Sequence, residues 1–453
     1  MTRFNGILGL LTGLVLAFLA CTFEAPDEPK NNVPRITSSA EVYAREKFSF
    51  RFTVTFSDPD GPDTLVIYDD YPSWLSQFAS TLYGTPPDGT SDTGFLVIVS
   101  DGISADTENV AVIVIPMNDR PRIISDDIVE AAGGMPFCYR VAVADPDGPV
   151  TQIHFRNYPS WLTADADSIY GTPPDGARNT SFMVTTWDGL LADTLGVFIK
   201  VNPTMVVYGD TRTNHTIHER VVAAITPVQP AAVFHTGDLV EDGYNPKDWL
   251  MFNSITAELL LTAEFFPALG NHEKQAQLYF DNFDLPNNEQ WYSVDRHYVH
   301  FIILNTCVAI DAGSEQYRWL ESDLAAIPDS VRFVAVAFHH PPYSTGRHGA
   351  EGAYLQETLV PLFEKYGVDI VFSGHDHDYE RSFCGGTYYI VTGGGGASLY
   401  DQVYEHPCSQ QYLKIHHFCK LSVVSDTLTV KVYDIDGRLA DQCEVHRRQR
   451  SRH

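Results

Sequence analysis

The first half of the chain repeats itself at one fixed spacing. Three motifs recur 87 residues later, namely DPDGP (58–62 and 145–149), YPSWL (71–75 and 158–162) and GTPPDG (84–89 and 171–176). Segments of alternating polar and apolar residues lie between them, and Pro, Gly and Asp interrupt these segments. This pattern is typical of short strands joined by turns. Units of this size indicate two tandem β-sandwiches.

The two units resemble the immunoglobulin-like and cadherin-like repeats of bacterial surface proteins. The segment PMNDRPRI at 116–123 is similar to a cadherin-type linker. We expect one repeat over 35–118 and the next over 119–202. The resemblance implies a spacer, or contact with a cell surface or glycan.

The Asp-rich turns of the repeats leave two interpretations open. In one, they are turns only, and Trp74 and Trp161 fill the two cores. In the other, clustered oxygens near the linker hold Ca²⁺, a hard cation that prefers oxygen ligands. The oxygens would come from Asp58, Asp60, Asn118 and Asp119.

The chain opens with an apolar run. Arg3 precedes residues 7–20, which are almost all apolar. The run is short for a membrane span and typical of a signal peptide, which we predict over 1–20. FLAC at 18–21 resembles a bacterial lipoprotein box, which implies a lipid on Cys21 and a linker over 21–34. Simple cleavage is the alternative.

Export would place the chain in the periplasm, on the outer membrane or outside a bacterial cell, with a lipid anchor as its membrane contact. It would also permit disulfides. Sequence alone does not set their pairing. Four cysteines cluster late in the chain, at Cys384, Cys408, Cys419 and Cys443.

The charge balance narrows the classes of partner. The chain has 58 acidic and 30 basic residues, a net charge of −28. A nucleic-acid binder needs a basic face, so we expect no nucleic-acid partner. An anionic substrate would need local positive charge.

The pattern changes after residue 203. Short apolar runs such as MVVYGD (205–210) and AAVFHTGD (231–238) alternate with segments of helical spacing such as HERVVAAITPV (218–228). We therefore predict an α/β domain over 203–445 and a basic tail over 446–453. Ligands are expected at the carboxyl ends of its strands.

Five apolar runs of this domain end in residues that bind metals. The mixture of carboxylate, amide and imidazole suits Zn, Mn or Fe. No cysteine stands at these positions, which argues against a structural zinc. The run-ends carry Asp210, Asp238, Asn271 with His272, His339 with His340, and His375 with His377.

The order GD, GD, GNHE, VAFH, GHDH resembles the calcineurin-like metallophosphoesterases, most closely the purple acid phosphatases, over about residues 204–436. The resemblance implies a four-layer α/β/β/α domain and two metal ions that activate a hydroxide for attack on a phosphate ester. It gives the first ion Asp210, Asp238 and His377. It gives the second ion Asn271, His339 and His375, with Asp238 bridging. From the residues alone, His340 fits as well as His339.

The chain departs from the family at the first ion. The family's tyrosine falls at Glu241, and the histidine of related phosphoesterases falls at Arg212. Glu241, Asn214 or water would have to fill the gap. Without the tyrosine we expect no purple colour.

The resemblance also implies roles beside the metals. His272 is placed to protonate the leaving group or to support the site. Arg212 is a candidate phosphate clamp or a surface salt bridge. His348 lies on a loop where the family contacts substrate. TGGGGAS (392–398) is expected to be a tight turn. Residues expected to orient the ligand imidazoles are Glu273, Asp376 and Asp378.

The leading prediction is an exported phosphomonoesterase resembling acid phosphatases. A nucleotidase or phosphodiesterase is the alternative within the superfamily. A surface adhesion or glycan-binding protein with an inactive domain is the alternative from another class. If both repeats are spacers, the part after residue 203 should keep its turnover.

Overall fold

The computed structural model describes residues 30–61, 64–148 and 152–448. The predicted signal peptide, Cys21 and the end of the basic tail lie outside them. None of the helices in these ranges combines the length and apolarity that a membrane crossing requires. The chain divides into two compact units. One comprises Met1–Asp119 with Pro146–Gly148, and the other Arg120–Asp145 with Pro149–His453.

The first unit contains a β-sandwich. One sheet has the order β2-β9-β8-β5 and the other β3-β7-β6, and β1 pairs with β4. Alternate residues of β8, such as Phe95, Val97 and Val99, are buried against Phe52 and Leu82 of the facing sheet. The strands are β1 (Arg35–Ile36), β2 (Glu41–Arg45), β3 (Phe50–Thr53), β4 (Phe56–Ser57), β5 (Leu65–Asp69), β6 (Leu75–Phe78), β7 (Thr81–Gly84), β8 (Thr93–Ser100) and β9 (Ala105–Ile115).

The second unit begins with a sandwich of the same strand order, β11-β18-β17-β14 facing β12-β16-β15, with β10 paired to β13. Each strand lies 87 residues after its counterpart. The strands are β10 (Arg122–Ile123), β11 (Ile128–Ala132), β12 (Phe137–Arg140), β13 (Val143–Ala144), β14 (Gln152–Arg156), β15 (Leu162–Asp165), β16 (Ser168–Gly171), β17 (Thr180–Trp187) and β18 (Ala192–Asn202).

The shared motifs have a packing reason. Trp74 lies edge-on to Phe50 with ring centroids 5.8 Å apart, and Trp161 lies at the same distance from Phe137. A Cβ atom at Gly84 would lie 2.0 Å from the Trp74 carbonyl oxygen. The glycine of GTPPDG is therefore required because the YPSWL backbone passes directly over it.

The predicted calcium ligands do not converge. Asp60 bonds Asn32 at 2.8 Å, just before β1, and Asp106 near the start of β9 bonds the Ile36 amide at 2.8 Å. Asn118 and Asp119 follow the other end of β9, a strand of 11 residues, or about 36 Å at the usual rise. Asp119 instead groups with Asp88 and Asp147. The four-residue grouping was wrong because β9 separates its halves.

The rest of the second unit is an α/β domain with two sheets. One has the order β21-β20-β19-β29-β30-β31 and the other β22-β23-β24-β25-β27-β26-β28. The first comprises β19 (Met205–Tyr208), β20 (Ala232–His235), β21 (Glu264–Pro267), β29 (His417–Val424), β30 (Thr427–Asp434) and β31 (Leu439–His446). The second comprises β22 (Tyr292–Arg296), β23 (Val299–Ile303), β24 (Phe333–Ala337), β25 (Ile370–Ser373), β26 (Tyr379–Cys384), β27 (Thr387–Thr392) and β28 (Ser409–Leu413).

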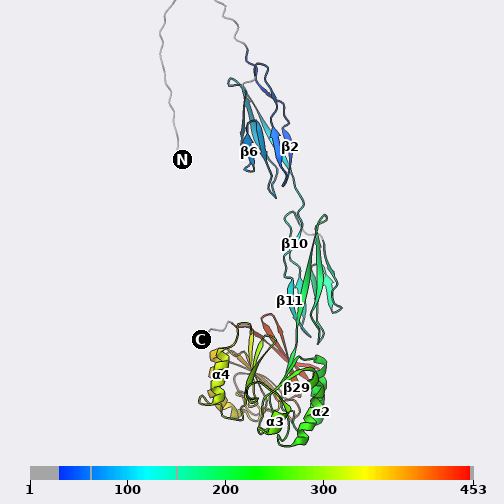
Figure 1. Ribbon diagram of the computed structural model, residues 1–453, viewed down its shortest axis with the longest axis vertical. Helices are drawn as coiled ribbons and strands as arrows, with labels where there is room; N and C mark the ends of the chain where they lie inside the picture. The colour runs from blue at the N-terminus through cyan, green and yellow to red at the C-terminus, as the bar shows by residue number, and fades with distance from the viewer. Residues whose placement is uncertain (1–29, 62–63, 149–151, 449–453) are drawn as a thin grey trace, which may run out of the picture. The chain divides into compact units, whose positions relative to one another are not determined.

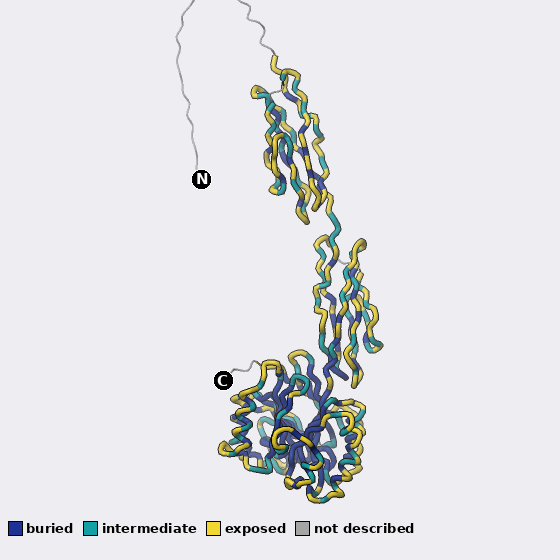
Figure 2. The backbone as a smooth tube through the Cα atoms, viewed as in Figure 1, coloured by how far each residue is buried: buried dark blue, intermediate teal, exposed yellow. Residues whose placement is uncertain are grey.

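The two sheets pack face to face with helices outside, as the expected four layers require. Phe333 and Ala335 of β24 enter the core between the sheets, whereas Val334 and Val336 face the outer core with Leu320 of α4. Helices α2 and α4 lie on opposite sides, and the buried backbone concentrates between them (Figures 1 and 2). The helices are α1 (His215–Ile225), α2 (Pro246–Thr262), α3 (Gln277–Asn282), α4 (Glu315–Ala325), α5 (Ala353–Thr358) and α6 (Val360–Tyr366), with short 3₁₀ turns at Thr226–Val228 and Gly349–Gly352.

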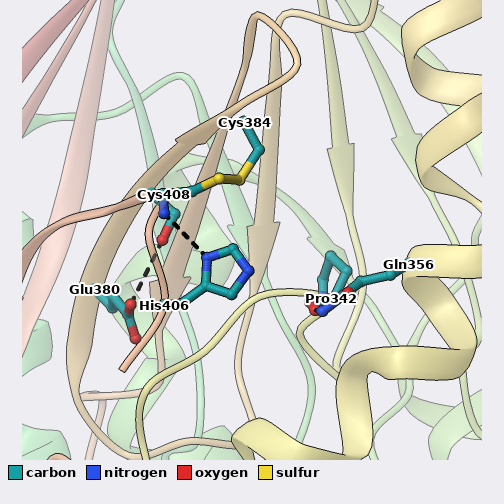
Figure 3. The surroundings of a disulfide bond; sticks show 7 residues. Pro342, Gln356, Glu380, Cys384, His406 and Cys408 are labelled. Carbon is teal, nitrogen blue, oxygen red and sulfur yellow. Dashed lines mark hydrogen bonds between the residues drawn. A yellow bond between two sulfur atoms is a disulfide. The ribbon is translucent and has the colours of Figure 1, made fainter. Parts of the chain in front are cut away.

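One disulfide joins two of the late cysteines. Cys384 ends β26 and bonds Cys408, which precedes β28 (Figure 3). The Cys408 amide donates to His406 Nδ1 at 3.2 Å. Cys419 and Cys443 are buried as free thiols.

Candidate metal centre

The predicted ligands meet where parallel strands end. Strands β19, β20 and β21 run parallel in one sheet, and β24 and β25 run parallel in the other. Asp210, Asp238 and His375 follow three of these strands with positive φ angles of 58°, 57° and 67°. This left-handed backbone is costly for residues other than glycine and is concentrated at functional sites.

Three ligand atoms converge on one nitrogen of His339. Its Nε2 lies 3.1 Å from Asn271 Oδ1, 3.2 Å from His375 Nδ1 and 3.3 Å from Asp238 Oδ1. Its Nδ1 donates to the Thr236 carbonyl at 3.0 Å, so the neutral ring presents a lone pair at Nε2. An amide oxygen, a carboxylate oxygen and an imidazole nitrogen this close to the lone pair of His339 Nε2 fit a bound cation. This is the position that the resemblance assigns to the second ion.

The remaining predicted ligands lie beside this group. Asp210, Asp238 and His339 offer atoms that are all within 4.8 Å of one another. Asp210 accepts the His375 amide at 3.0 Å, and its Oδ1 lies 3.6 Å from His377 Nε2. All six predicted metal ligands therefore occupy one region.

The electrostatics fit a cation as well. Burial and the neighbouring Asp238 charge raise the pKa of Asp210 well above its ordinary value. Burial lowers the pKa of His375 to about 2 and that of His377 to about 4. The imidazoles are thus neutral ligands at physiological pH, whereas the ionised carboxylates require positive charge nearby. The donor set fits Zn, Mn or Fe.

Two of the three carboxylates that were expected to orient the imidazoles bond backbone amides. The Glu273 carboxylate accepts the amides of Asp238, Leu239 and Gly270 at 2.9, 2.8 and 2.7 Å and so fixes the loop after β20. Burial raises the pKa of Glu273 to about 8. Asp376 accepts the His348 amide at 2.9 Å. Our expectation was wrong for Glu273 and Asp376, because loop amides and a serine hydroxyl, and not imidazoles, donate to them. The role of Asp378 stays a prediction.

Backbone carbonyls orient the rings instead. His377 Nδ1 donates to Ser398 O at 2.8 Å, as His339 does to Thr236. Ser398 ends the glycine segment, whose Gly395 amide bonds Gly209 O at 2.8 Å. A Cβ atom at Gly393 would lie 2.1 Å from the Asp376 carbonyl oxygen. The glycines are needed for this close approach to the site, as the predicted tight turn requires.

His272 and His348 lie at the edge of the centre. The His272 amide bonds Asp238 Oδ1 at 3.0 Å, and its Nδ1 donates to Glu241 O at 2.7 Å. Its Nε2, 3.9 Å from Asp238 Oδ2, is the nitrogen left for proton transfer. His348 bonds Glu351 at 2.8 Å, and its ring lies 4.2 Å from that of His375.

Arg212 points into the centre. Its Nε donates to Asp238 Oδ2 at 3.1 Å and its Nη1 to Glu241 Oε2 at 3.0 Å, while Nη2 lies 3.4 Å from His377 Nε2. The side chain is 16% exposed, so a surface salt bridge does not describe it. Asn214 caps α1 by accepting the Ile217 amide at 3.3 Å and is not turned to the metals.

His340 lies close to the centre, since its ring offers a nitrogen within 4.8 Å of those of His339 and His375, but its hydrogen-bond partner differs from those of His339. His340 Nδ1 bonds Thr306 Oγ1 at 2.8 Å, while His339 faces Asn271 and Asp238. Two further contacts escaped sequence reasoning. Tyr400 stacks on the His377 ring at 4.2 Å, and Glu351 lies 3.4 Å from His375 Nε2. Neither residue belongs to a metal-ligand motif: Glu351 lies three residues after His348, and Tyr400 follows the glycine segment.

Comparison with known proteins gives a family match. A model described as calcineurin-like phosphoesterase matches residues 203–379. Purple acid phosphatase 15 of Arabidopsis thaliana is 33% identical over 180 residues, which cover 34% of this chain and 34% of that protein. An uncharacterized protein of Mycobacterium tuberculosis is 29% identical over 339 residues, 57% of this chain and 60% of that protein. A solved purple acid phosphatase from yellow lupin (Lupinus luteus) is 16% identical, covers 92% of this chain and 96% of that chain, and has a TM-score of 0.49.

The matches cover only part of this chain and part of its relatives. The chain covers 34%, 45% and 38% of the length of three purple acid phosphatases of A. thaliana. The predicted calcineurin-like domain is confirmed for residues 203–379. The immunoglobulin-like or cadherin-like identity of the repeats, and the roles of individual residues, stay predictions.

Proposed function

We propose that the calcineurin-like phosphoesterase domain of this chain hydrolyses phosphate esters, phosphomonoesters first among them, with metal ions held at the ends of β19, β20, β21, β24 and β25. The convergence of Asn271, His375 and Asp238 on His339 Nε2 carries the proposal. Such ions would offset the phosphate charge and lower the pKa of the attacking water. They would also supply the positive charge that the acidic chain lacks.

The chain's own residues supply the remaining chemistry. Glu241 O holds one proton on His272 Nδ1, so a second proton taken up by the ring resides on Nε2, from where it can pass to the leaving oxygen and leave the ring neutral. The ring stays in place because the His272 amide is bonded to Asp238. His348, fixed by Glu351 and by Asp376, borders the same centre and is proposed to contact the substrate.

We extend the proposal to the compartment. The apolar N-terminus and the Cys384–Cys408 disulfide support export, because disulfides persist in oxidising compartments. The proposed partners are a small phosphate ester, a lipid anchor at Cys21, and a cell surface or glycan contacted by the repeats. No nucleic-acid partner is proposed. A nucleotidase or phosphodiesterase activity would use the same centre.

Metal depletion and reloading test the activity. The metal-stripped chain should lose hydrolysis of phosphate mono- and diesters and regain it with Zn²⁺, Mn²⁺ or iron. Asp238→Ala should abolish the regain, whereas Asp281→Ala on α3 serves as the matched control. A reloaded chain that binds metal and hydrolyses neither class of ester would instead favour an adhesion protein with an inactive domain.

The leaving group tests His272. A poor leaving group needs a proton in the transition state, and a nitrophenolate does not. His272→Ala should therefore slow alkyl phosphate hydrolysis by about 10- to 100-fold more than nitrophenyl phosphate hydrolysis. His154→Ala, on an exposed strand of the second sandwich, is the control. Equal losses on both esters, together with loss of metal, would reject the acid role.

A further inference from the structure

The guanidinium of Arg212 lies among the groups that the family resemblance assigns to the first ion. It bridges Asp238 Oδ2 at 3.1 Å and His377 Nε2 at 3.4 Å, and Glu241 anchors its other side at 3.0 Å. Glu241 stands where the family has its tyrosine ligand. Arg212 and its carboxylate partner Glu241 thus stand together at two positions where the family or its relatives have a metal ligand.

The predicted ligands approach one another more closely at the second metal position than at the first. At the second position, Asn271 Oδ1, His375 Nδ1 and Asp238 Oδ1 approach His339 Nε2 directly, at 3.1–3.3 Å. At the first, His377 is outside the group formed by Asp210, Asp238 and His339. The gap between His377 and Asp238 is bridged by N–H donors of Arg212. Donors satisfy these atoms where an ion would otherwise do so.

The charge of Arg212 cannot be removed by pH, because a guanidinium stays protonated in proteins. An ion in the first position must therefore displace the side chain or share the site with a like charge. Displacement would break the bonds of Arg212 to Asp238 and Glu241. Both routes lower the affinity of the first position for its ion. Neither changes the contacts of Asn271, His339 or His375 at the second position.

We propose that Arg212 acts as a built-in cation in the first metal position, so that the second position binds its ion tightly and the first fills only when the guanidinium moves away. This inference rests on the proposed function, since it concerns the same centre. It makes Arg212 a regulator of metal loading.

Equilibrium dialysis of the metal-stripped full chain against Mn²⁺ or Zn²⁺, followed by metal analysis, tests the inference. The wild-type chain should bind one ion tightly, and a second at a concentration about 10- to 100-fold higher, the range by which neighbouring groups alter metal affinity. Arg212→Met should narrow this gap by tightening the weaker step. Arg212→His, which restores the residue of related phosphoesterases, should narrow it further.

The matched control is Arg220→Met, because Arg220 on α1 is half-exposed and pairs with Asp436 and not with a predicted metal ligand. It should keep the wild-type gap, and near-ultraviolet circular dichroism should show that each variant is folded. Two equally tight ions in the wild-type chain, or an unchanged gap in both Arg212 variants, would overturn the inference and leave the proposed function standing. Binding of no ion at all would remove both.

Discussion

Tyr43 and Glu130 occupy the same position of the two sandwiches, 87 residues apart, and they meet opposite environments. Tyr43 is 62% exposed on β2. Glu130, on β11, is 15% exposed and bonds Arg332 of the α/β domain at 2.7 and 3.0 Å. It also accepts the Ser425 amide at 2.9 Å. One scaffold thus serves once as a surface and once as part of an interface.

A second pair of positions shows how the interface is made. In the first sandwich, Lys47 pairs with Asp88 of GTPPDG at 3.1 Å. The counterparts in the second are Gly134 and Asp175, and Lys420 of β29 pairs with Asp175. A Cβ atom at Gly134 would lie 2.7 Å from Lys420 Nζ, so the glycine makes room for this lysine. The α/β domain supplies the lysine that the first sandwich supplies itself.

The comparison teaches that the repeats are not equivalent spacers. The second sandwich covers Lys420, which is only 4% exposed, and bonds Val423 O through Asn202 at 2.9 Å. It therefore stabilises the α/β domain. The expectation that the part after residue 203 keeps its turnover applies only if this interface contributes little.

The largest effect should follow removal of both sandwiches. A chain that begins at residue 203 exposes Arg332 and Lys420 without their carboxylate partners. We expect a large drop in melting temperature, because the removed sandwich takes away the acceptors of Arg332 and Lys420 and the Asn202 hydrogen bond, and each hydrogen bond to a charged group contributes about 1.5–3 kcal/mol. Thermal unfolding and ester hydrolysis measure this. Wild-type stability and turnover would show that both repeats are spacers.

A single substitution should give a smaller loss. Glu130→Ala leaves Arg332 and the Ser425 amide without their acceptor. We expect the free energy of unfolding of the second unit to fall by about 2–3 kcal/mol, the range for hydrogen bonds to charged groups. Tyr43→Ala, the same position of the first sandwich, should change it little. Similar losses of unfolding free energy for the two variants in denaturant titrations would contradict the proposed difference between the two sandwiches.

The same pair should depend on pH. Hydrogen bonding to Arg332 lowers the pKa of Glu130 from 4.5 to about 2. A group whose pKa is lower in the folded state stabilises the fold above its unfolded pKa and loses this contribution as pH falls. The difference in melting temperature between wild type and Glu130→Gln should thus be full above pH 4.5 and shrink toward pH 2. A difference that stays constant across this window would contradict the ion pair.

The smallest effect should follow removal of the first sandwich alone. A chain that begins at residue 120 keeps the Glu130, Asp175 and Asn202 contacts. We expect turnover on small esters and the unfolding transition of the second unit to match those of the full chain. A clear loss of turnover with metals still bound would show that the first sandwich contributes to the centre.

Local patterns were enough to predict much of this protein. The 87-residue spacing of the motifs is also the spacing between each strand of the first sandwich and its counterpart in the second. It could be predicted because strands and turns depend on residues only a few positions apart. The ends of the apolar runs predicted which side chains would meet, because parallel strands of one sheet deliver their last residues to the same edge. The six predicted metal ligands do lie in one region, namely Asp210, Asp238, Asn271, His339, His375 and His377.

Only the tertiary structure decided which groups meet across the fold. Glu130 and Arg332 are 202 positions apart. The groups that orient His339 and His377 are backbone carbonyls, which every residue has and which therefore leave no signal in the sequence. The pairing of Cys384 with Cys408, and the place of Arg212 between Asp238 and His377, likewise depend on how distant loops converge. A sequence pattern records the chemistry that each residue can offer. Its partner is set by packing, because side-chain contacts act over a few ångströms in space and take no account of separation along the chain.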